Sequence, residues 1–277
     1  MKKINDDDYP CYHEDASQQS MDSQRKYKQL IWSILLLMIV STAMQSVPNV
    51  FDNRVKGIIV FLGLIGTVLM MIFQPDKSWY IGRAIAESIK TLSWRYMMRS
   101  QPFDGLRVDD RFIQRCSEIL NAAIKNEGFI HKPTCKHSQI ITDTMRGIRN
   151  LPFDERKAVY LEERIKDQIS WYQAKSKFNG KRATISLIVV GVCQLLALLF
   201  LIFLGDSEFD ITSVLIVIAT TAISIMEMNK YRELERSYSF TAFELNNIKN
   251  RFGLINNNDD LDIFVEEAEQ AISREHT

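Results

Sequence analysis

Four apolar stretches constrain this chain more than any other feature of its sequence, because each is long and free of charged residues. A helix needs about 20 apolar residues to cross the hydrocarbon core of a bilayer. The first three stretches meet this length. The fourth is shorter, and Phe209 before it and a snorkelling Lys230 after it can extend it. A buried core helix is the alternative for the fourth stretch. The stretches cover residues 29–51, 57–75, 183–205 and 211–226.

The stretches form two pairs, each joined by a tight connection, and a mostly polar region over residues 76–182 separates the pairs. This is a duplication of architecture without a residue-level repeat. We therefore predict an all-α, multipass membrane protein with four transmembrane helices arranged as two hairpins, and with a cytoplasmic helical, coiled-coil region. The expected spans are residues 30–48, 57–75, 183–205 and 210–227.

The orientation follows from Lys and Arg, which are enriched on the cytoplasmic side of membrane proteins. The first hairpin loop carries only Arg54 and Lys56, and the second carries three acids and no base. Both termini and the middle region should therefore be cytoplasmic. The basic residues near the other ends of the spans are Arg25, Lys26, Lys28, Lys77, Arg83, Lys90, Lys175, Lys177, Lys181, Arg182, Lys230, Arg232 and Arg236.

Composition and motifs argue against several classes of function. The 34 basic side chains balance 34 acidic ones, whereas a nucleic-acid binder usually has a basic excess. No phosphate-binding, dinucleotide-binding, serine-hydrolase or zinc-protease motif is present, so we expect neither an enzyme nor a cofactor. His131, Cys135 and His137 lie close together in sequence, but a fourth ligand at set spacing is missing, so a polar loop is expected rather than a metal site. The four cysteines have no CxxC spacing and are expected to be reduced thiols.

Helical periodicity describes the cytoplasmic parts. Helices are expected at residues 76–100, continuing from the second span, and at 109–126, 138–149 and 259–274, the last capped by Asp259 or Asp260. Another should run unbroken from Asp154 into the third span. The apolar face of the 109–126 helix comprises Ile113, Cys116, Leu120 and Ala123; the seam before span three comprises Leu161, Ile165, Gln168, Tyr172, Lys175 and Asn179; the seam after span four comprises Leu234, Tyr238, Thr241, Leu245, Ile248 and Phe252.

Small polar residues share faces within two spans. Ser33, Ser41 and Gln45 lie near one face of the first span. Ser213, Thr220 and Ser224 lie near one face of the fourth. None is charged, which disfavours a proton relay or a voltage sensor. Two interpretations stay open: the residues pack helices against each other, or they line a water-filled pore once several subunits assemble. The second requires a homo-oligomer, because four spans cannot enclose a wide channel alone.

The helix before span three resembles a pattern of the SLATT family, the SMODS- and SLOG-associating two-transmembrane effectors. The residues that carry this resemblance are Arg156, Tyr160, Leu161, Arg164, Gln168, Trp171, Tyr172, Lys175 and Asn179. The C-terminal string from Phe264 to His276 resembles the end of the same domain. The N-terminal half is similar to a second SLATT subtype, through Tyr9-Pro10, Ala16-Ser17 and the string from Ala86 to Phe103. Proteins with this tandem are DUF4231-like. The expected domains are 1–105 and 140–277, with a helical linker over 106–139.

The resemblance implies a membrane effector of a bacterial nucleotide-signalled conflict or antiphage system, located in the inner membrane and acting with a nucleotide-generating or nucleotide-sensing partner. On a signal it would form pores and kill or arrest the cell. Trp171 and Tyr172 could stack on a nucleotide, or could belong to an aromatic belt at the membrane surface. The alternative function is a non-catalytic membrane anchor or scaffold that recruits a cytoplasmic partner through its coiled-coil faces. A small transporter is disfavoured, because no broken helix with midplane charges is visible.

Overall fold

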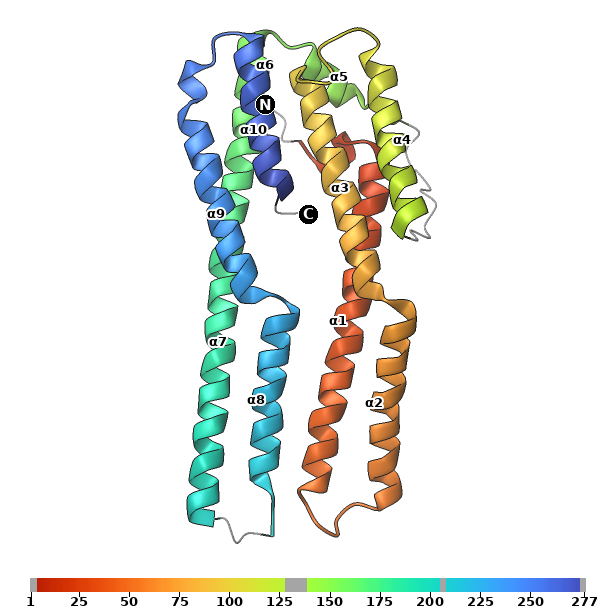
Figure 1. Ribbon diagram of the computed structural model, residues 1–277, viewed down its shortest axis with the longest axis vertical. Helices are drawn as coiled ribbons and strands as arrows, with labels where there is room; N and C mark the ends of the chain where they lie inside the picture. Colours follow the sequence, from red (N-terminus) through yellow and green to blue (C-terminus); the bar gives the residue numbers. More distant parts are fainter. Residues whose placement is uncertain (1–3, 128–138, 205–207, 275–277) are drawn as a thin grey trace. The chain divides into compact units, whose positions relative to one another are not determined.

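A computed structural model describes residues 4–127, 139–204 and 208–274 (Figure 1). All of the regular structure in these ranges is helical, with no strand among the described residues. The elements are η1 (Asp6–Asp8), α1 (Cys11–Gln45), α2 (Asn53–Phe73), α3 (Pro75–Met98), α4 (Val108–Glu127), α5 (Asp143–Arg149), α6 (Phe153–Tyr160), the π-helix η2 (Leu161–Lys166), α7 (Asp167–Leu204), α8 (Ile211–Met228), α9 (Tyr231–Asn250), η3 (Phe252–Leu254) and α10 (Asn258–Arg274).

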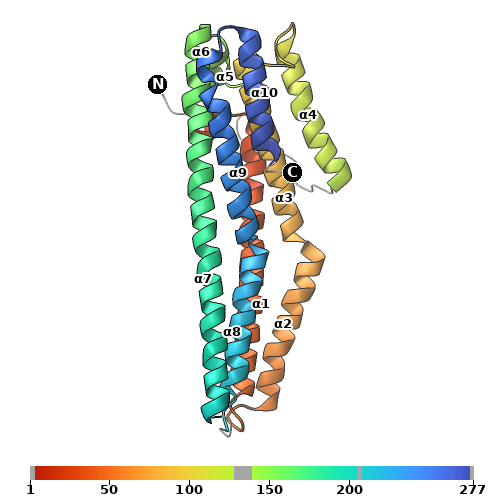
Figure 2. The same ribbon diagram turned by 60° about the vertical axis from the view of Figure 1, so that its left-hand side comes forward.

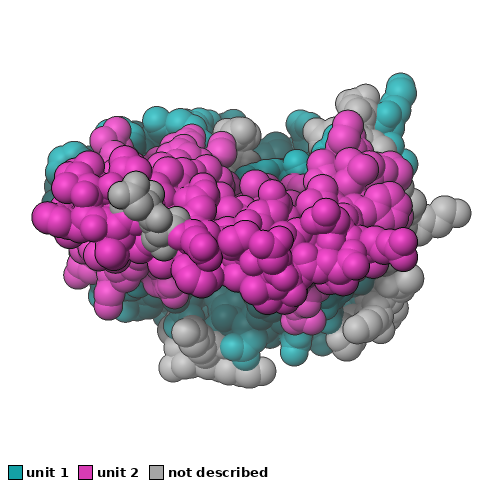
Figure 3. Space-filling model, turned by 90° about the horizontal axis from the view of Figure 1, so that it is seen from below, with its two compact units in different colours: residues 1–24, 76–174, 237–277 teal, residues 25–75, 175–236 magenta. Residues whose placement is uncertain are grey.

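The chain divides into two compact units (Figure 3). Unit 1 comprises Met1–Gln24, Asp76–Ala174 and Ser237–Thr277, and unit 2 comprises Arg25–Pro75 and Lys175–Arg236. Within the described residues, four helical stretches are long and apolar enough to cross a membrane. The expected all-α multipass membrane protein is therefore confirmed, and all four apolar stretches lie in unit 2.

The surface of unit 2 is apolar, as expected for helices that are surrounded by lipid. Large apolar side chains are exposed along all four spans, and α2 has no buried residue at all. Between α7 and α8, which lie side by side in both views (Figures 1 and 2), Val190, Cys193 and Ala219 form a small buried cluster. The helices α1 and α2 approach closely at Gly66, where an added Cβ would lie 2.9 Å from Cγ1 of Ile34.

Each hairpin ends in the same kind of break. Gln74, between α2 and α3, has φ 39° and ψ 54°, and Lys230, between α8 and α9, has φ 48°. The prediction that the helix over 76–100 continues directly from the second span is therefore wrong. Its physical reason is Pro75, because the residue before a proline is disfavoured in the right-handed helical region. Gln74 alone separates α2 from α3, whereas Asn229 and Lys230 separate α8 from α9, so each break contains one residue with a positive φ.

The buried residues of α9 and α4 confirm most of the apolar faces predicted for these two segments, and they correct one position on α4. On α9, Tyr238, Thr241, Leu245 and Ile248 are buried as predicted, with Leu234 and Phe252 half-buried. On α4, Cys116, Leu120 and Ala123 are buried, but Ile113 is 38% exposed and Phe112 takes its place at 0%. Phe112 packs against Tyr96 and Phe103, with ring centroids 5.1 and 5.7 Å away. The larger aromatic side chain thus fills the core, and the helix is rotated accordingly.

The predicted seam before span three is wrong at two positions. The buried residues there are Arg164, Ile165, Ile169, Tyr172 and Asn179, while Gln168 is half-buried and Lys175 is exposed. An apolar Ile169 can be buried without a partner, whereas Gln168 would need one. The long helix itself is confirmed, because α6, η2 and α7 are continuous from Phe153 to Leu204.

The cap of the last helix also differs from the prediction. Asn257 precedes α10, and its Oδ1 accepts a hydrogen bond from the backbone N–H of Asp260, 2.8 Å away. In return, the Asp260 carboxylate accepts from the backbone N–H of Asn256 at 3.0 Å. Asn257 is therefore the cap, rather than Asp259 or Asp260, because a capping side chain must precede the first helical turn.

Candidate functional site

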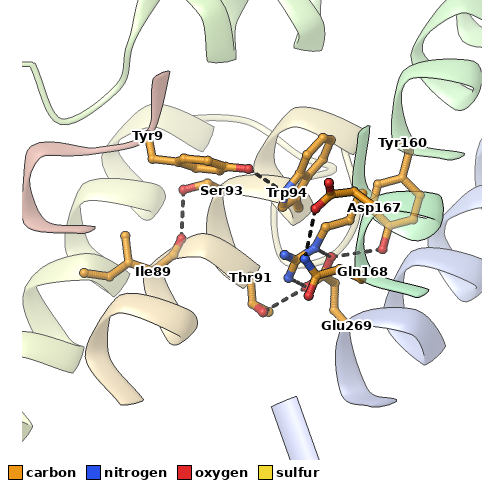
Figure 4. Close-up of polar contacts among 10 residues, drawn as sticks. Tyr9, Ile89, Thr91, Ser93, Trp94, Tyr160, Asp167, Gln168 and Glu269 are labelled. Carbon is orange, nitrogen blue, oxygen red and sulfur yellow. Dashed lines mark hydrogen bonds and ion pairs between the residues drawn. The ribbon is translucent and has the colours of Figure 1, made fainter. Parts of the chain in front are cut away.

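A buried ion pair lies at the centre of unit 1. Arg164 and Glu269 have side chains that are 1% and 0% exposed. Nη2 of Arg164 donates to Oε2 of Glu269 at 2.7 Å, and Nε donates to Oε1 at 2.9 Å, which makes the pair bidentate (Figure 4). Such a fork is the most favourable geometry for an Arg–carboxylate pair. The cost of removing both charges from water is therefore offset by two aligned charge-assisted hydrogen bonds.

Two neutral donors complete the hydrogen bonding of the carboxylate. The Tyr160 hydroxyl donates to Oε1 of Glu269 at 3.0 Å, and the Thr91 hydroxyl donates to Oε2 at 2.8 Å. Burial and the Glu269 carboxylate both raise the pKa of Tyr160, so its hydroxyl stays protonated and remains a donor. Burial alone would lower the pKa of Arg164, but the attraction of Glu269 outweighs it and the pKa is raised. The Arg164 guanidinium therefore keeps its charge across the physiological pH range.

The ion pair joins segments that are far apart in sequence. Thr91 lies on α3, Tyr160 and Arg164 lie on the continuous α6–η2 helix, and Glu269 lies on α10. Trp94, also on α3, packs its ring against Tyr160 with centroids 5.6 Å apart and donates Nε1–H to the Tyr9 hydroxyl at 3.0 Å. Residues from the first and last thirds of the chain thus meet at one carboxylate.

The π-helix η2 positions Arg164. It covers Leu161–Lys166 and buries both Arg164 and Ile165, two neighbouring residues. A π-helical turn holds more residues than an α-helical turn, so it shifts the side chains that follow relative to a regular helix. Segments of this kind are frequent at functional sites. Nη1 of Arg164 is buried and has no hydrogen-bond partner among the described residues, so part of the guanidinium's donor capacity is unused.

Two further ionisable side chains lie beside Tyr9, the buried His13 and the half-buried Lys90. The His13 ring lies 5.1 Å from the Tyr9 ring, and Nζ of Lys90 lies 5.2 Å from the centroid of the same ring. Burial, reinforced by the positive charge of Lys90, lowers the pKa of His13 to about 4. Burial also lowers the pKa of Lys90. His13 is therefore neutral at physiological pH, so the half-buried Lys90 and the buried Arg164 carry the positive charge beside Tyr9.

The other motif residues of the helix before span three have separate environments. Arg156 donates to the Leu151 carbonyl at 3.3 Å and to the side-chain amide oxygen of Asn258. Trp171 and Tyr172 pack against Tyr238 of α9, with centroids 5.4 and 5.6 Å away.

These environments bear on the proposed nucleotide contact. Because Tyr172 is fully buried, its ring faces cannot stack on a ligand while the domain is folded. Gln168 donates to the neighbouring Asp167 at 3.4 Å, Lys175 is exposed, and Asn179 is buried in unit 2. Of the motif residues, the structure brings Tyr160 and Arg164 together at Glu269, and it brings Trp171 and Tyr172 together at Tyr238.

The polar residues of the spans are mostly satisfied within their own helices. Ser33 donates to the Gln29 carbonyl at 2.9 Å, Thr220 donates to the Ile216 carbonyl at 2.9 Å, and Ser224 donates to the Thr220 carbonyl at 2.9 Å. None of these hydroxyls needs a partner on another helix, so each can face lipid, another helix or water.

The other three candidate lining residues form hydrogen bonds with each other or within a helix cap. Nε2 of Gln45 donates to the Ser41 hydroxyl at 3.0 Å on α1. Ser213 belongs to the N-terminal cap of α8, because its backbone N–H and hydroxyl both donate to the Asp210 carboxylate. Thr221, which the sequence reasoning left out of this set, is the buried hydroxyl of α8. A role for the six residues in lining a pore stays a prediction.

The cysteines and the short His/Cys string need separate statements. Cys11 is disulfide-bonded, so the expectation of four reduced thiols is wrong there, while Cys116 and Cys193 are free and buried. His131, Cys135 and His137 lie outside the described residues. Over the ranges that the structure describes, no cluster of three or more His, Cys, Asp or Glu could hold a metal ion.

Sequence reasoning missed Glu269, the acceptor around which the buried cluster is built. A signal was present, because Glu269 follows Val265 by four residues and Leu261 by eight, on the apolar face of α10. An acid at such a position is buried only with a partner. The sequence alone does not identify Arg164 as that partner, since the two are separated by more than a hundred residues.

Comparison with known families agrees with the resemblance drawn from the motifs. The model of SMODS and SLOG-associating 2TM effector domain 3, SLATT_3, matches residues 10–157, and that of domain 1, SLATT_1, matches residues 160–277. No curated protein and no solved structure matches the chain. The predicted boundaries at residues 105 and 139 stay predictions. The two matches cover nearly the whole chain, and it belongs to the SLATT family as a tandem of two SMODS and SLOG-associating 2TM effector domains.

Proposed function

We propose that this protein is a membrane effector of a bacterial nucleotide-signalled conflict or antiphage system, which forms a pore on homo-oligomerisation and thereby kills or arrests the cell. One observation carries the proposal: two effector domains of the SLATT family lie in tandem on a chain with four apolar spans. The action is non-catalytic and needs no cofactor. The partners are the lipid membrane, further copies of the chain and a nucleotide-generating or nucleotide-sensing protein, without nucleic acid.

The chemistry of the spans supports an uncharged pore lining. The candidate lining residues Thr220 and Ser224 lie one turn apart on α8, and each hydroxyl hydrogen already bonds a backbone carbonyl of its own helix. Their oxygens remain acceptors for water. Hydroxyl-lined faces can therefore hydrate a channel without burying an unsatisfied donor. Several subunits must contribute such faces, because four spans are too few to enclose a wide channel.

The continuous helix from Phe153 to Leu204 supports a mechanical route for the signal. Its first part carries Tyr160 and Arg164 of the buried cluster, and its last part is the third span. A partner that altered the packing around Glu269 would therefore act on an element that is itself a membrane span. We propose that this movement rearranges the spans and opens the pore.

The orientation belongs to the proposal as well. The excess of Lys and Arg beside the ends of the spans favours both termini and unit 1 in the bacterial cytoplasm, and we propose the inner membrane as the location. The disulfide at Cys11 favours the opposite side, because disulfides persist in oxidising compartments. Reporter fusions decide between the two. A C-terminal green fluorescent protein should fluoresce and a C-terminal alkaline phosphatase should be inactive, and the reverse result would contradict the orientation.

The pore is tested by the membrane potential of cells during induced expression, with and without phage challenge. We expect depolarisation by the wild type. The double variant Thr220→Leu, Ser224→Leu should abolish it at equal membrane abundance, because leucine offers water no acceptor. Thr67→Leu is the matched control: its hydroxyl also donates to its own helix, at 3.1 Å to the Gly63 carbonyl, but it lies outside the candidate faces. Equal conductance in the double variant would refute the pore-lining role.

A membrane anchor or scaffold is the second candidate function, and exposed aromatic residues on α9 favour it. The coiled-coil seam of α9 is buried within unit 1, so a partner cannot use it. Phe240 and Phe243, on the outward face of the same helix, are 62% and 63% exposed. A scaffold would recruit its partner through this pair. A steady membrane potential, together with loss of partner capture in Phe240→Ser, Phe243→Ser, would favour the scaffold.

A further inference from the structure

An arginine cluster lies at the end of unit 1 where α3 ends and α6 begins (Figure 1). Two hydrogen bonds hold its two segments together. Nε of Arg99, just after α3, donates to the Arg149 carbonyl at 2.9 Å, and Nη1 of Arg149, at the end of α5, donates to the Tyr96 carbonyl. The cluster therefore rests on direct contacts between α3 and the segment that leads into α6. Its members are Arg95, Arg99, Arg149 and Arg156.

Arg95 and Arg156 lie on helix faces that meet. Thr91 on α3 and Tyr160 on α6 both donate to the Glu269 carboxylate, which fixes where the two helices come together. Arg95 follows Thr91 by four residues, and Arg156 precedes Tyr160 by four. Residues four apart share a helix face, so both arginines belong to the faces that meet at Glu269. The positive charge of Arg95 acts on Tyr160, in agreement with this placement.

Arg156 is a buried cation whose partners are neutral. It is 2% exposed, and its terminal nitrogens donate to the Leu151 carbonyl at 3.3 Å and to the side-chain oxygen of Asn258. Nε of Arg156 and Nε of Arg95 are buried and have no hydrogen-bond partner among the residues that the structure describes. Burial lowers the pKa of Arg156, and the charges of two other arginines of the cluster lower it further. A buried guanidinium without a carboxylate is costly, and a bound anion would offset that cost.

The acids near the end of α3 are engaged by other groups. The Asp262 carboxylate accepts from the backbone N–H of Gln101 at 2.9 Å. Asp109, whose charge acts on Arg149, pairs with Arg146 at 2.8 Å. Within the described part of the chain, no member of the arginine cluster forms an ion pair with an acid.

Capping of backbone carbonyls accounts for only part of the cluster. Arg149 has this role, because its terminal nitrogens donate to the carbonyls of Tyr96 and Phe103, the second at 2.8 Å. Arg99 is exposed and uses Nε alone, and its Nη1 and Nη2 make no hydrogen bond within the described residues. A planar pair of N–H groups of this kind binds phosphate oxygens in bidentate fashion.

We propose that Arg99 and Arg156, together with Arg95, bind a phosphate group of a small soluble molecule. A phosphate group carries up to two negative charges and has three acceptor oxygens, so it can bond several guanidinium groups at once. Arg95 lies about 30 Å along α3 from the first residue of this helix, Pro75, where the span-bearing unit ends, which favours a soluble ligand over a lipid headgroup. The proposal goes beyond pore formation and does not rest on it.

The test is isothermal titration calorimetry of the full chain in a neutral detergent, with pyrophosphate as the probe at constant ionic strength. We expect the wild type to bind pyrophosphate. Arg99→Gln should raise the Kd roughly tenfold, the loss that corresponds to one hydrogen bond to a charged group, and its exposed position leaves the fold intact. Arg115→Gln is the matched control and should leave the Kd unchanged, because it also removes an exposed arginine of unit 1, but one that pairs with Glu118 at 3.1 Å.

Three results would overturn the proposal: no binding by the wild type at millimolar pyrophosphate, an unchanged Kd in Arg99→Gln, or an equal loss in Arg115→Gln. Dioctanoyl phosphatidylglycerol separates the two sources of a phosphate group. If this lipid binds more tightly than pyrophosphate, and Arg99→Gln weakens its binding, the ligand is a lipid headgroup and the proposed soluble ligand is wrong.

Arg156→Gln gives an independent answer through thermal unfolding with and without pyrophosphate. A ligand that binds only the folded state raises the midpoint of unfolding. If Arg156 only caps the Leu151 carbonyl, pyrophosphate should raise the midpoint of this variant as much as that of the wild type, and that result would contradict the site. We expect instead that the rise is lost in the variant.

Discussion

Glu269→Gln is the sharpest perturbation of the buried cluster, because it removes one charge and almost no volume. In the variant, Arg164 keeps its charge in a fully buried position and loses the bidentate carboxylate at 2.7 and 2.9 Å. Breaking a buried ion pair in this way costs about 3–5 kcal/mol, since the remaining charge is left uncompensated. For a domain of 150–250 residues, each kcal/mol corresponds to about 2–4 °C, so the midpoint of unfolding should fall by about 6–20 °C.

The assay is thermal unfolding of the full chain in dodecyl maltoside, followed by far-ultraviolet circular dichroism. The control is Glu267→Gln on the same helix, which breaks the ion pair with Arg251, whose partners are 51% and 39% exposed. Exposed pairs contribute about 0–1 kcal/mol, so this variant should change the midpoint by a few degrees at most. A Glu269→Gln midpoint within that same range would refute the reasoning, because it would mean that water reaches Arg164.

Three further predictions follow from unit 1 and the hairpins. The pKa of His13, about 4, lies below its unfolded value of about 6.5, so the unfolded state takes up the proton first as the pH falls. The free energy of unfolding should therefore fall by about 3 kcal/mol between pH 6.5 and 4. This decrease should be absent in His13→Gln when urea unfolding of the two proteins is compared over this range. Gly82→Ala should destabilise the protein by about 1–3 kcal/mol in thermal unfolding, since the added Cβ would lie 3.1 Å from backbone atoms of α1. Gly147→Ala is the control: it has open space around it and should stabilise the protein slightly, and equal effects of the two variants would contradict the close approach at Gly82. Gln74→Gly should stabilise by up to about 1 kcal/mol, because glycine adopts the left-handed conformation without a steric penalty, and a loss of stability in the same assay would contradict that conformation.

The spans and the helical fold class were predictable because they depend on composition, which local sequence reports directly. The errors arose where a single residue or a local irregularity changes the geometry. Pro75 ends the continuity of α2 and α3 by forcing Gln74 out of the right-handed helix. Next to the π-helical segment at Leu161–Lys166, Ile169 is buried where Gln168 was predicted, although Tyr172 and Asn179 keep their predicted burial. Period counting assumes a constant number of residues per turn and cannot detect either event.

The buried cluster was only half predictable. Tyr160 and Arg164 were found through the family motif, but their common acceptor Glu269 lies more than a hundred residues away, and only the tertiary fold brings it to them. Thr91 and Trp94 lie in the string from Ala86 to Phe103 that carries the resemblance, but their contacts in this cluster were not predicted, for the same reason. An isolated segment shows that a charge lies on an apolar face, and the burial cost then requires a partner. The identity of that partner is a property of packing, which helix periodicity does not contain.

The two kinds of connection between the units have different mechanical properties. The helix α1 and the helix α7 each run without interruption across the boundary between unit 1 and unit 2. The spans α2 and α8 instead end at breaks that each contain one residue with a positive φ, Gln74 after α2 and Lys230 after α8. A continuous helix carries a displacement along its whole length, whereas one residue can absorb a change of direction through its two dihedral angles. A signal at the Arg164–Glu269 pair would therefore move the third span directly, while α8 could adjust its direction at Lys230. In each half of the protein, one span therefore continues as a helix into unit 1, and the other span ends at a break in the helix.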